Sequence, residues 1–122
     1  MNLKENVIKG RAGEKIAEDY LKRSGYKIIE KNWHYSKNAE IDIIAAENNT
    51  LVFVEVKTRT TLNFGHPFEA INNSKLHKIY TAIYAYMNNN NKNNYKSFRL
   101  DGIAIIGIKN PKIEHIKNIG QF

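Results

Sequence analysis

The spacing of apolar residues predicts two amphipathic helices. Between residues 6 and 24, apolar positions recur at steps of three and four, which places them on one face of a helix. These positions are Ile8, Ala12, Ile16, Ala17, Tyr20 and Leu21. Gly25 would end this helix as a left-handed cap. A second helix is expected to begin at Asn73 or Ser74, since either residue can cap it. Its apolar stripe comprises Leu76, Ile79, Tyr80, Ile83 and Met87.

Five other segments have the composition of β-strands, rich in aliphatic and aromatic side chains. They are residues 26–35, 40–46, 51–58, 98–108 and 112–117. Residues 47–50 are typical of a hairpin turn, so the second and third strands should pair. Residues 103–108 are apolar on both faces. We therefore expect that run at the centre of the sheet, with both faces covered.

The order of these elements is helix, three strands, helix and two strands. It predicts an α/β fold with a mixed β-sheet of about five strands flanked by helices, in the order αβββαββ. Residues 59–70 lack a period and should form a loop that can move over the hairpin, and the asparagine-rich residues 88–94 should form a solvated loop. A length of 122 residues suits one compact domain, expected to span residues 1–122.

Charge adds a class of partner to this picture. The 19 basic and 12 acidic residues give a formal net charge of +7, which favours polyanions and makes nucleic acid the leading partner class. The absence of cysteine excludes disulfide scaffolds, thiolate zinc sites and cysteine nucleophiles. No apolar run approaches the length of a membrane span, and residues 1–11 do not resemble a secretory signal. We expect a cytoplasmic protein that does not interact with membranes.

Charged residues interrupt two of the predicted strands. Along residues 51–59, alternate side chains point to opposite faces of the sheet, so Glu55 and Lys57 share one face and the valines share the other. Charged side chains are rarely buried unless they are paired or hold a metal. Asp42 poses the same question, because it lies within an otherwise aliphatic strand.

Pairing the two strands through the turn at residues 47–50 places Asp42 opposite Glu55. Like charges at such a position repel each other, and a divalent cation between them would remove the repulsion. Carboxylate oxygens suit Mg²⁺, which also retains waters and binds substrate phosphates. The pattern therefore points to metal-assisted hydrolysis of phosphodiester bonds, with Lys57 as a charge beside the reacting phosphate. In the simpler interpretation, Glu55 and Lys57 belong to an exposed cross-strand charge network, and Asp42 is a strand-edge residue that favours solubility.

The residues around these positions resemble a known family. Glu40–Ile44 and Val52–Arg59 look like motifs of the YraN-type bacterial family, a branch of the PD-(D/E)xK nuclease superfamily. Gly10–Glu14 resembles the family's first-helix motif, Asn32–Trp33 its first strand and Phe98–Asp101 its penultimate strand. The resemblance covers almost the whole chain. The order of motifs is also similar to that of archaeal Holliday-junction resolvases.

This resemblance implies a restriction-endonuclease-like fold and a site for Mg²⁺ or Mn²⁺. The implied metal ligands are the side chains of Asp42, Glu55 and Glu14 and the carbonyl of Val56. Lys57 would aid catalysis. The sequence departs from the family pattern at Ala39, where glycine is usual, and it lacks the superfamily's nominal proline before Asp42. From spacing alone, Glu14 is an ordinary residue on the flank of its helix.

Other residues are candidates for contacts with nucleic acid. The basic candidates are Arg11, Arg59, Lys75 and Lys78, of which Lys75 is favoured because the corresponding helix often borders the site in the superfamily. Each also fits the role of a solvated surface charge. Three tyrosines of the second helix, Tyr80, Tyr84 and Tyr86, could stack on bases, although helical spacing favours packing. Glu40 is predicted to be a salt-bridge or hairpin residue rather than a metal ligand, and His66 is the histidine of interest in the loop.

The favoured hypothesis is a divalent-metal-dependent nuclease acting on DNA, with branched or damaged DNA as candidate substrates. The first alternative is a catalytically weak or inactive nucleic-acid-binding module with the same fold. A second is a basic protein-interaction partner. A homodimer would suit a two-fold substrate such as a four-way junction, but no sequence feature shows one. Nothing in the sequence distinguishes DNA from RNA or an endonuclease from an exonuclease.

Overall fold

The computed structural model describes residues 3–63, 65–69, 71–89, 95–107 and 109–120, with side chains described from residue 10 onward. Seven elements follow one another along the chain. They are α1 (Leu3–Arg23), β1 (Lys27–Ser36), β2 (Ala39–Glu47), β3 (Thr50–Arg59), α2 (Asn73–Asn89), β4 (Ser97–Ile106) and β5 (Lys112–Ile116). The predicted loop at 88–94 overlaps the end of α2, and its residues 90–94 lie outside the described part. Neither helix is long and apolar enough to cross a membrane.

The sheet contains five strands in the order β1-β2-β3-β4-β5. Neighbouring strands are antiparallel except β3 and β4, which are parallel because α2 makes the crossover between them. The predicted α/β class and the order αβββαββ are confirmed. Residues 103–106 lie on β4, an interior strand between β3 and β5, and Ile103, Ala104 and Ile105 are buried as predicted, although the middle strand is β3. Residue 108 lies outside the described part. The strand also ends at Ile106, and Gly107 follows with a φ of 105°.

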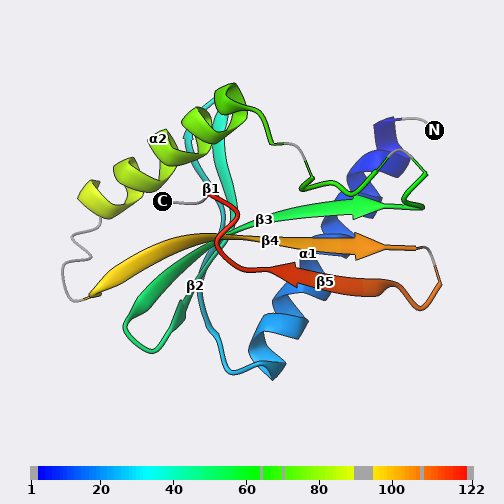
Figure 1. The fold of residues 1–122 in the computed structure, drawn as a ribbon, viewed down its shortest axis with the longest axis horizontal. Coiled ribbons are helices and arrows are strands. Elements are labelled where there is room, and N and C mark those ends of the chain that lie inside the picture. The colour runs from blue at the N-terminus through cyan, green and yellow to red at the C-terminus, as the bar shows by residue number, and fades with distance from the viewer. Residues whose placement is uncertain (1–2, 64, 70, 90–94, 108, 121–122) are drawn as a thin grey trace.

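The two helices pack on the five-stranded sheet (Figure 1). An apolar core lies under each helix, on opposite faces of the sheet. The α1-side core comprises Ala17, Leu21, Tyr26, Ile43, Ala45, Val52, Val54, Ile103 and Ile105. The α2-side core comprises Ala39, Ile41, Ile44, Leu51, Phe53, Ile79, Ala82, Ile83, Tyr86 and Leu100. The predicted alternation along β3 is confirmed, since its valines face α1 while Leu51 and Phe53 face α2.

The alternation breaks on β2 at Asp42. Ile41 belongs to the α2-side core and Ile43 to the α1-side core, although residues two apart in a regular strand share a face. The pairing of Lys31 with Ile43 and of Trp33 with Ile41 puts Asn32 beside Asp42 on the neighbouring strand. Asn32 has a φ of 52°, in the left-handed region. Both strands therefore depart from regular alternation at Asn32 and Asp42. The β2 residues on either side of Asp42 face opposite cores.

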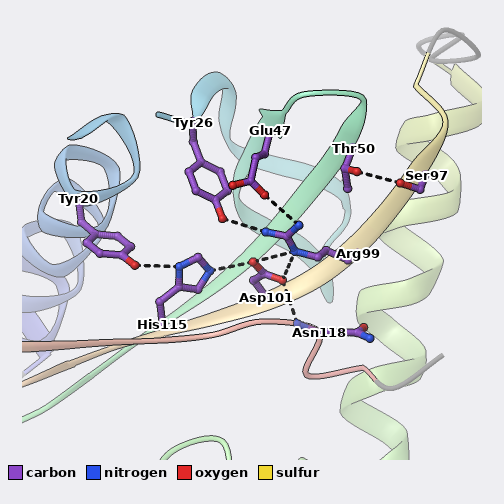
Figure 2. A network of polar contacts seen from close by, with 9 residues as sticks. All are labelled: Tyr20, Tyr26, Glu47, Thr50, Ser97, Arg99, Asp101, His115 and Asn118. Carbon is purple, nitrogen blue, oxygen red and sulfur yellow. Dashed lines mark hydrogen bonds and ion pairs between the residues drawn. The ribbon is translucent and has the colours of Figure 1, made fainter. Parts of the chain in front are cut away.

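A network of polar residues joins β4 to β5, α1 and β2 (Figure 2). Its centre is Asp101 of β4, which is fully buried. The Arg99 Nε donates to the Asp101 carboxylate at 2.9 Å, and the His115 Nε2 lies 2.8 Å from its other oxygen. The Tyr20 hydroxyl on α1 contacts the far side of the His115 ring at 3.0 Å. The network thus fastens α1 and β5 to the sheet.

Candidate metal and nucleic-acid site

The paired carboxylates of the site come from β2 and β3. The ladder between these strands runs from Glu47 opposite Thr50 to Ile43 opposite Val54. Asp42 and Glu55 are the next residues beyond the ladder, as the hairpin register predicts. The Asp42 carboxylate turns toward β3 and accepts a hydrogen bond of 2.8 Å from the backbone N–H of Val56. The two strands therefore carry Asp42 and Glu55 to one place at the end of the hairpin.

Asp42 is surrounded by other acidic groups. Burial raises its pKa to about 7, and the Glu55 charge acts in the same direction. Weaker repulsion comes from Glu14 and Glu40, while the hydrogen bond from the Val56 N–H lowers the pKa. Among the described residues, the nearby acids therefore raise the Asp42 pKa more than the hydrogen bond from Val56 lowers it. The carboxylate would be stabilised by a cation.

Two lysines accompany Glu55, whose residue is only 9% exposed. The Lys57 Nζ lies 3.9 Å from the Glu55 Oε1, and the Lys75 Nζ lies 3.4 Å from the same oxygen. Burial lowers the pKa of Lys57 even though the Glu55 charge raises it. The structure thus brings Lys57 and Lys75 to the acidic pair. Alternation along the strand predicted this position for Lys57, and the resemblance favoured Lys75.

Two pockets open beside Asp42 and Glu55, and both are bordered by that pair. The α1-side pocket, of about 330 Å³, is also lined by Gly10, Glu14, Val56, Lys57, Thr58 and Arg59. The α2-side pocket, of about 230 Å³, is also lined by Lys37, Asn38, Glu40, Lys75, Lys78 and Ile79. A group bound at the two carboxylates would therefore be accessible from both sides of the sheet.

Glu14 reaches the α1-side pocket because α1 approaches β3 closely at Gly13. A methyl group at Gly13 would stand 2.2 Å from the Thr58 Oγ1, so only glycine fits without a shift. Ala12, which the apolar spacing assigned to the buried stripe, is exposed, and Gly13 is buried in its place. The Asn32 side chain hydrogen-bonds Glu14, and burial raises the pKa of this Glu. The resemblance, not the spacing, identified Glu14 as a neighbour of the pair.

The donor groups present fit a hard divalent cation. Two carboxylates whose repulsion a cation would remove are typical of Mg²⁺ sites, which complete their coordination with water and substrate oxygens. Among the described residues, no group of three or more His, Cys, Asp or Glu side chains is arranged to hold a metal. Asp42 and Glu55 would therefore be the main protein ligands, with Glu14 nearby. Ligation by the Val56 carbonyl stays a prediction.

The other predicted residues lie at varying distances from the pair. Arg59 lines the α1-side pocket, and its Nη1 donates to the Thr58 carbonyl. Lys78 lines the α2-side pocket. Arg11 is exposed near Glu14, and its charge lowers the pKa of that Glu. Their contacts with nucleic acid stay predictions.

The remaining candidates have structural surroundings of their own. The Glu40 carboxylate lies 3.9 Å from the His34 Nε2 and also borders the α2-side pocket. Its role in a salt bridge stays a prediction. His66 contacts Glu114 of β5, away from both pockets. Tyr86 is buried in the core beside Phe53 and Trp33, whereas Tyr84 is 49% exposed.

Sequence reasoning missed two residues beside the pair, Asn32 and Lys37. Asn32 was noted only as part of a motif, although asparagine is among the residues that tolerate a left-handed backbone. Lys37 lies in the turn between β1 and β2, and it lines the α2-side pocket because that turn leads directly into β2. The sequence signal for Lys37 was its place in the turn directly before the strand that carries Asp42.

Comparison with known proteins gives a family. The model of the uncharacterised protein family UPF0102 matches residues 13–105, which include both strands of the site. The chain belongs to this family. It is 45% identical over 115 residues to a UPF0102 protein of Caldanaerobacter subterraneus subsp. tengcongensis, covering 89% of this chain and 91% of that protein. It is 37% identical over 112 residues to one from Paenarthrobacter aurescens, covering 90% and 91% respectively.

Proposed function

We propose that this protein is a divalent-metal-dependent nuclease that hydrolyses phosphodiester bonds in DNA. The observation that carries the proposal is the pair Asp42 and Glu55, held together beside Lys57 at the mouths of two pockets. The net charge of +7 suits a polyanionic substrate. The resemblance to the YraN-type branch of the PD-(D/E)xK superfamily, with its restriction-endonuclease-like fold, supports the same function and suggests branched or damaged DNA.

Each residue has a defined part in this proposal. Asp42 and Glu55 would hold Mg²⁺ or Mn²⁺, with the Val56 carbonyl and Glu14 as additional oxygen donors. When bound, the metal would lower the pKa of a water molecule and neutralise charge on the phosphate. Lys57 would orient and stabilise the phosphate charge, and burial lowers its pKa below the usual range of a lysine. Arg59 and Arg11 would contact flanking phosphates.

A second candidate, a nucleic-acid-binding module with weak or no catalysis, is favoured by one observation. The Lys75 Nζ lies 3.4 Å from the Glu55 Oε1, so a lysine can offset the charge of this carboxylate without a metal. Such a protein would bind DNA with a strong dependence on salt, because phosphate contacts release counterions. It would not cleave DNA under any metal condition.

A panel of labelled substrates separates the two candidates. Linear, nicked, flap and four-way DNA and a matched RNA are incubated with Mg²⁺ or Mn²⁺ and with protein from parallel preparations. The variants Asp42→Asn and Glu55→Gln should lower cleavage by roughly 100-fold or more. Asp19→Asn is the matched control, because Asp19 is an exposed carboxylate paired with Lys15 on α1.

Two results would contradict the nuclease proposal. One is cleavage that survives in both site variants, which would identify a contaminating enzyme. The other is the absence of cleavage by the wild-type protein on every substrate. A readout independent of activity is the melting temperature, which Mn²⁺ should raise for the wild type and for Asp19→Asn but not for Asp42→Asn. Binding of DNA that is insensitive to salt would contradict both candidates.

A further inference from the structure

The two pockets differ in the charges that each adds to the shared pair. Beyond Asp42 and Glu55, the α1-side pocket adds one acid, Glu14, and two cations, Lys57 and Arg59. The α2-side pocket adds three lysines, Lys37, Lys75 and Lys78, and the single acid Glu40. The Glu40 carboxylate lies within ion-pair distance of His34 on β1. The α2-side pocket is therefore the more cationic of the two.

The three lysines converge from separate parts of the fold. Lys37 lies in the turn between β1 and β2, whereas Lys75 and Lys78 lie three residues apart in the first turns of α2. Residues at that spacing are on the same face of a helix. Like charges gathered around a hollow repel one another, and an anion in that hollow would relieve the repulsion. A volume of about 230 Å³ exceeds the roughly 30 Å³ share of one water molecule several times, so a phosphate fits.

Lys75 connects this pocket to the carboxylate pair. In the structure its Nζ lies 3.4 Å from the Glu55 Oε1, where it offsets the Glu55 charge. A cation bound by Glu55 would take over that role and repel the ammonium group. The Lys75 side chain is 47% exposed and can turn toward the pocket. A cation bound at Asp42 and Glu55 would therefore make the α2-side pocket more cationic.

We propose that the α2-side pocket is a phosphate subsite, which binds the phosphate next to the one held at Asp42 and Glu55. This inference rests on the proposed function, and it names the substrate as a strand that carries at least two consecutive phosphates. Lys37, from the turn before β2, and Lys78, from α2, bind the neighbouring phosphate. The α1-side pocket, which contains Glu14 and Lys57, holds the reacting phosphate.

The test compares ligands that differ by one phosphate. The ligands are a dinucleoside monophosphate and the same compound with an added terminal phosphate, at either its 5′ or its 3′ end. Binding is measured by amide chemical shifts in NMR with Ca²⁺ present. The variant Lys37→Ala/Lys78→Ala removes the two exposed lysines that do not touch Glu55. The matched control is Lys27→Ala/Lys96→Ala, which removes the same charge at the hairpin end of the sheet.

For the wild type and the control, the added phosphate at one of the two ends should tighten binding by about five-fold or more. For Lys37→Ala/Lys78→Ala, the gain should fall below about two-fold. The added phosphate should also shift amides near residues 37–40 and 75–79 in the wild type. An equal gain in all three proteins would overturn the subsite, as would a gain lost equally in the control.

This experiment is separable from the nuclease test because it requires no cleavage. If the wild type cleaves no substrate but the phosphate gain depends on Lys37 and Lys78, the subsite stands and the nuclease proposal fails. If cleavage depends on Asp42 and Glu55 but the gain does not depend on the lysines, the subsite fails alone. Circular dichroism checks that both double variants are folded.

Discussion

Two aspartates of the same sheet, Asp42 and Asp101, have opposite surroundings. Asp101 is fully buried, which raises its pKa, but hydrogen bonds from His115, Arg99 and the Asn118 N–H outweigh burial and lower the pKa overall. Asp42 has the Val56 N–H as a donor and other acids as neighbours, and burial raises its pKa to about 7.

The surroundings of the two carboxylates separate a structural role, at Asp101, from a candidate functional role, at Asp42. Asp101 is part of a satisfied network that holds β4, β5 and α1 together (Figure 2), and it lines neither of the two pockets. The raised pKa of Asp42 means that its ionisation opposes folding, and Asp42 borders both pockets. A buried charge that is retained at a cost in stability, beside a cavity, is a candidate for function.

The largest expected effect is on the satisfied aspartate. Asp101→Ala should lower the free energy of unfolding by about 3–5 kcal/mol, because it leaves the Arg99 charge without its buried partner. Urea denaturation followed by circular dichroism measures this loss. Asp19→Ala, at an exposed ion pair, should change stability by less than about 0.5 kcal/mol. Equal effects of the two variants would remove the structural role given to Asp101.

A second test concerns the approach of α1 to the Asp42 region. Gly13→Ala should cost about 1–3 kcal/mol, because its methyl group would overlap the Thr58 Oγ1. In a Thr58→Ala background the oxygen is gone, and the helix propensity of alanine should make Gly13→Ala neutral or stabilising by up to about 1 kcal/mol. Urea denaturation of the four proteins in this cycle checks the sign change. A cost that persists in the Thr58→Ala background would show that the clash is not with the Thr58 side chain.

The third prediction uses the opposite pKa shifts. The pKa of Asp42 is raised, so in metal-free buffer its charge destabilises the fold increasingly as pH rises from about 4 through about 7. Asp42→Asn should therefore be more stable than the wild type by about 1–2 kcal/mol at pH 8, and by much less at pH 4. The pKa of Asp101 is lowered, so its stabilisation is lost as pH falls below about 4. Thermal melts in EDTA from pH 3 to 8 measure both trends, and an Asp42→Asn that is destabilised at pH 8 would contradict the comparison.

The smallest effect on stability is expected at Asn32. Glycine adopts a φ of 52° freely, so Asn32→Gly should change stability by less than about 0.5 kcal/mol, whereas Asn32→Ala should cost about 1 kcal/mol. Both variants lose the hydrogen bond to Glu14 and should weaken Mn²⁺ binding by a similar factor of several-fold. Melting curves and Mn²⁺ titration by electron paramagnetic resonance separate these effects. Metal affinity that follows stability instead would leave Asn32 with a purely structural role.

Much of the fold could be predicted because local patterns carry it. The period of the apolar residues identified both helices and all five strands to within a few residues at their ends. The register at the hairpin also predicted that Asp42 and Glu55 would lie together. Across a hairpin, the residue numbers of every facing pair add up to the same value. These features depend on neighbours in the sequence.

The strand order and the contacts between segments far apart in the sequence depend on the tertiary structure. The position of β3 at the middle of the sheet depends on how the crossover through α2 places β4, which no local pattern encodes. The approach of Glu14 depends on the contact of Gly13 with Thr58, and the gathering of Lys37 with Lys78 depends on how α2 packs on the sheet. Asp42 and Asp101 are both aspartates in apolar strands, and the hairpin register singled out only Asp42. The partners of Asp101 include His115 and Asn118, which the fold brings to it. Their pKa values diverge because burial raises both, but hydrogen bonds offset it at Asp101, whereas the Glu55 charge adds to it at Asp42.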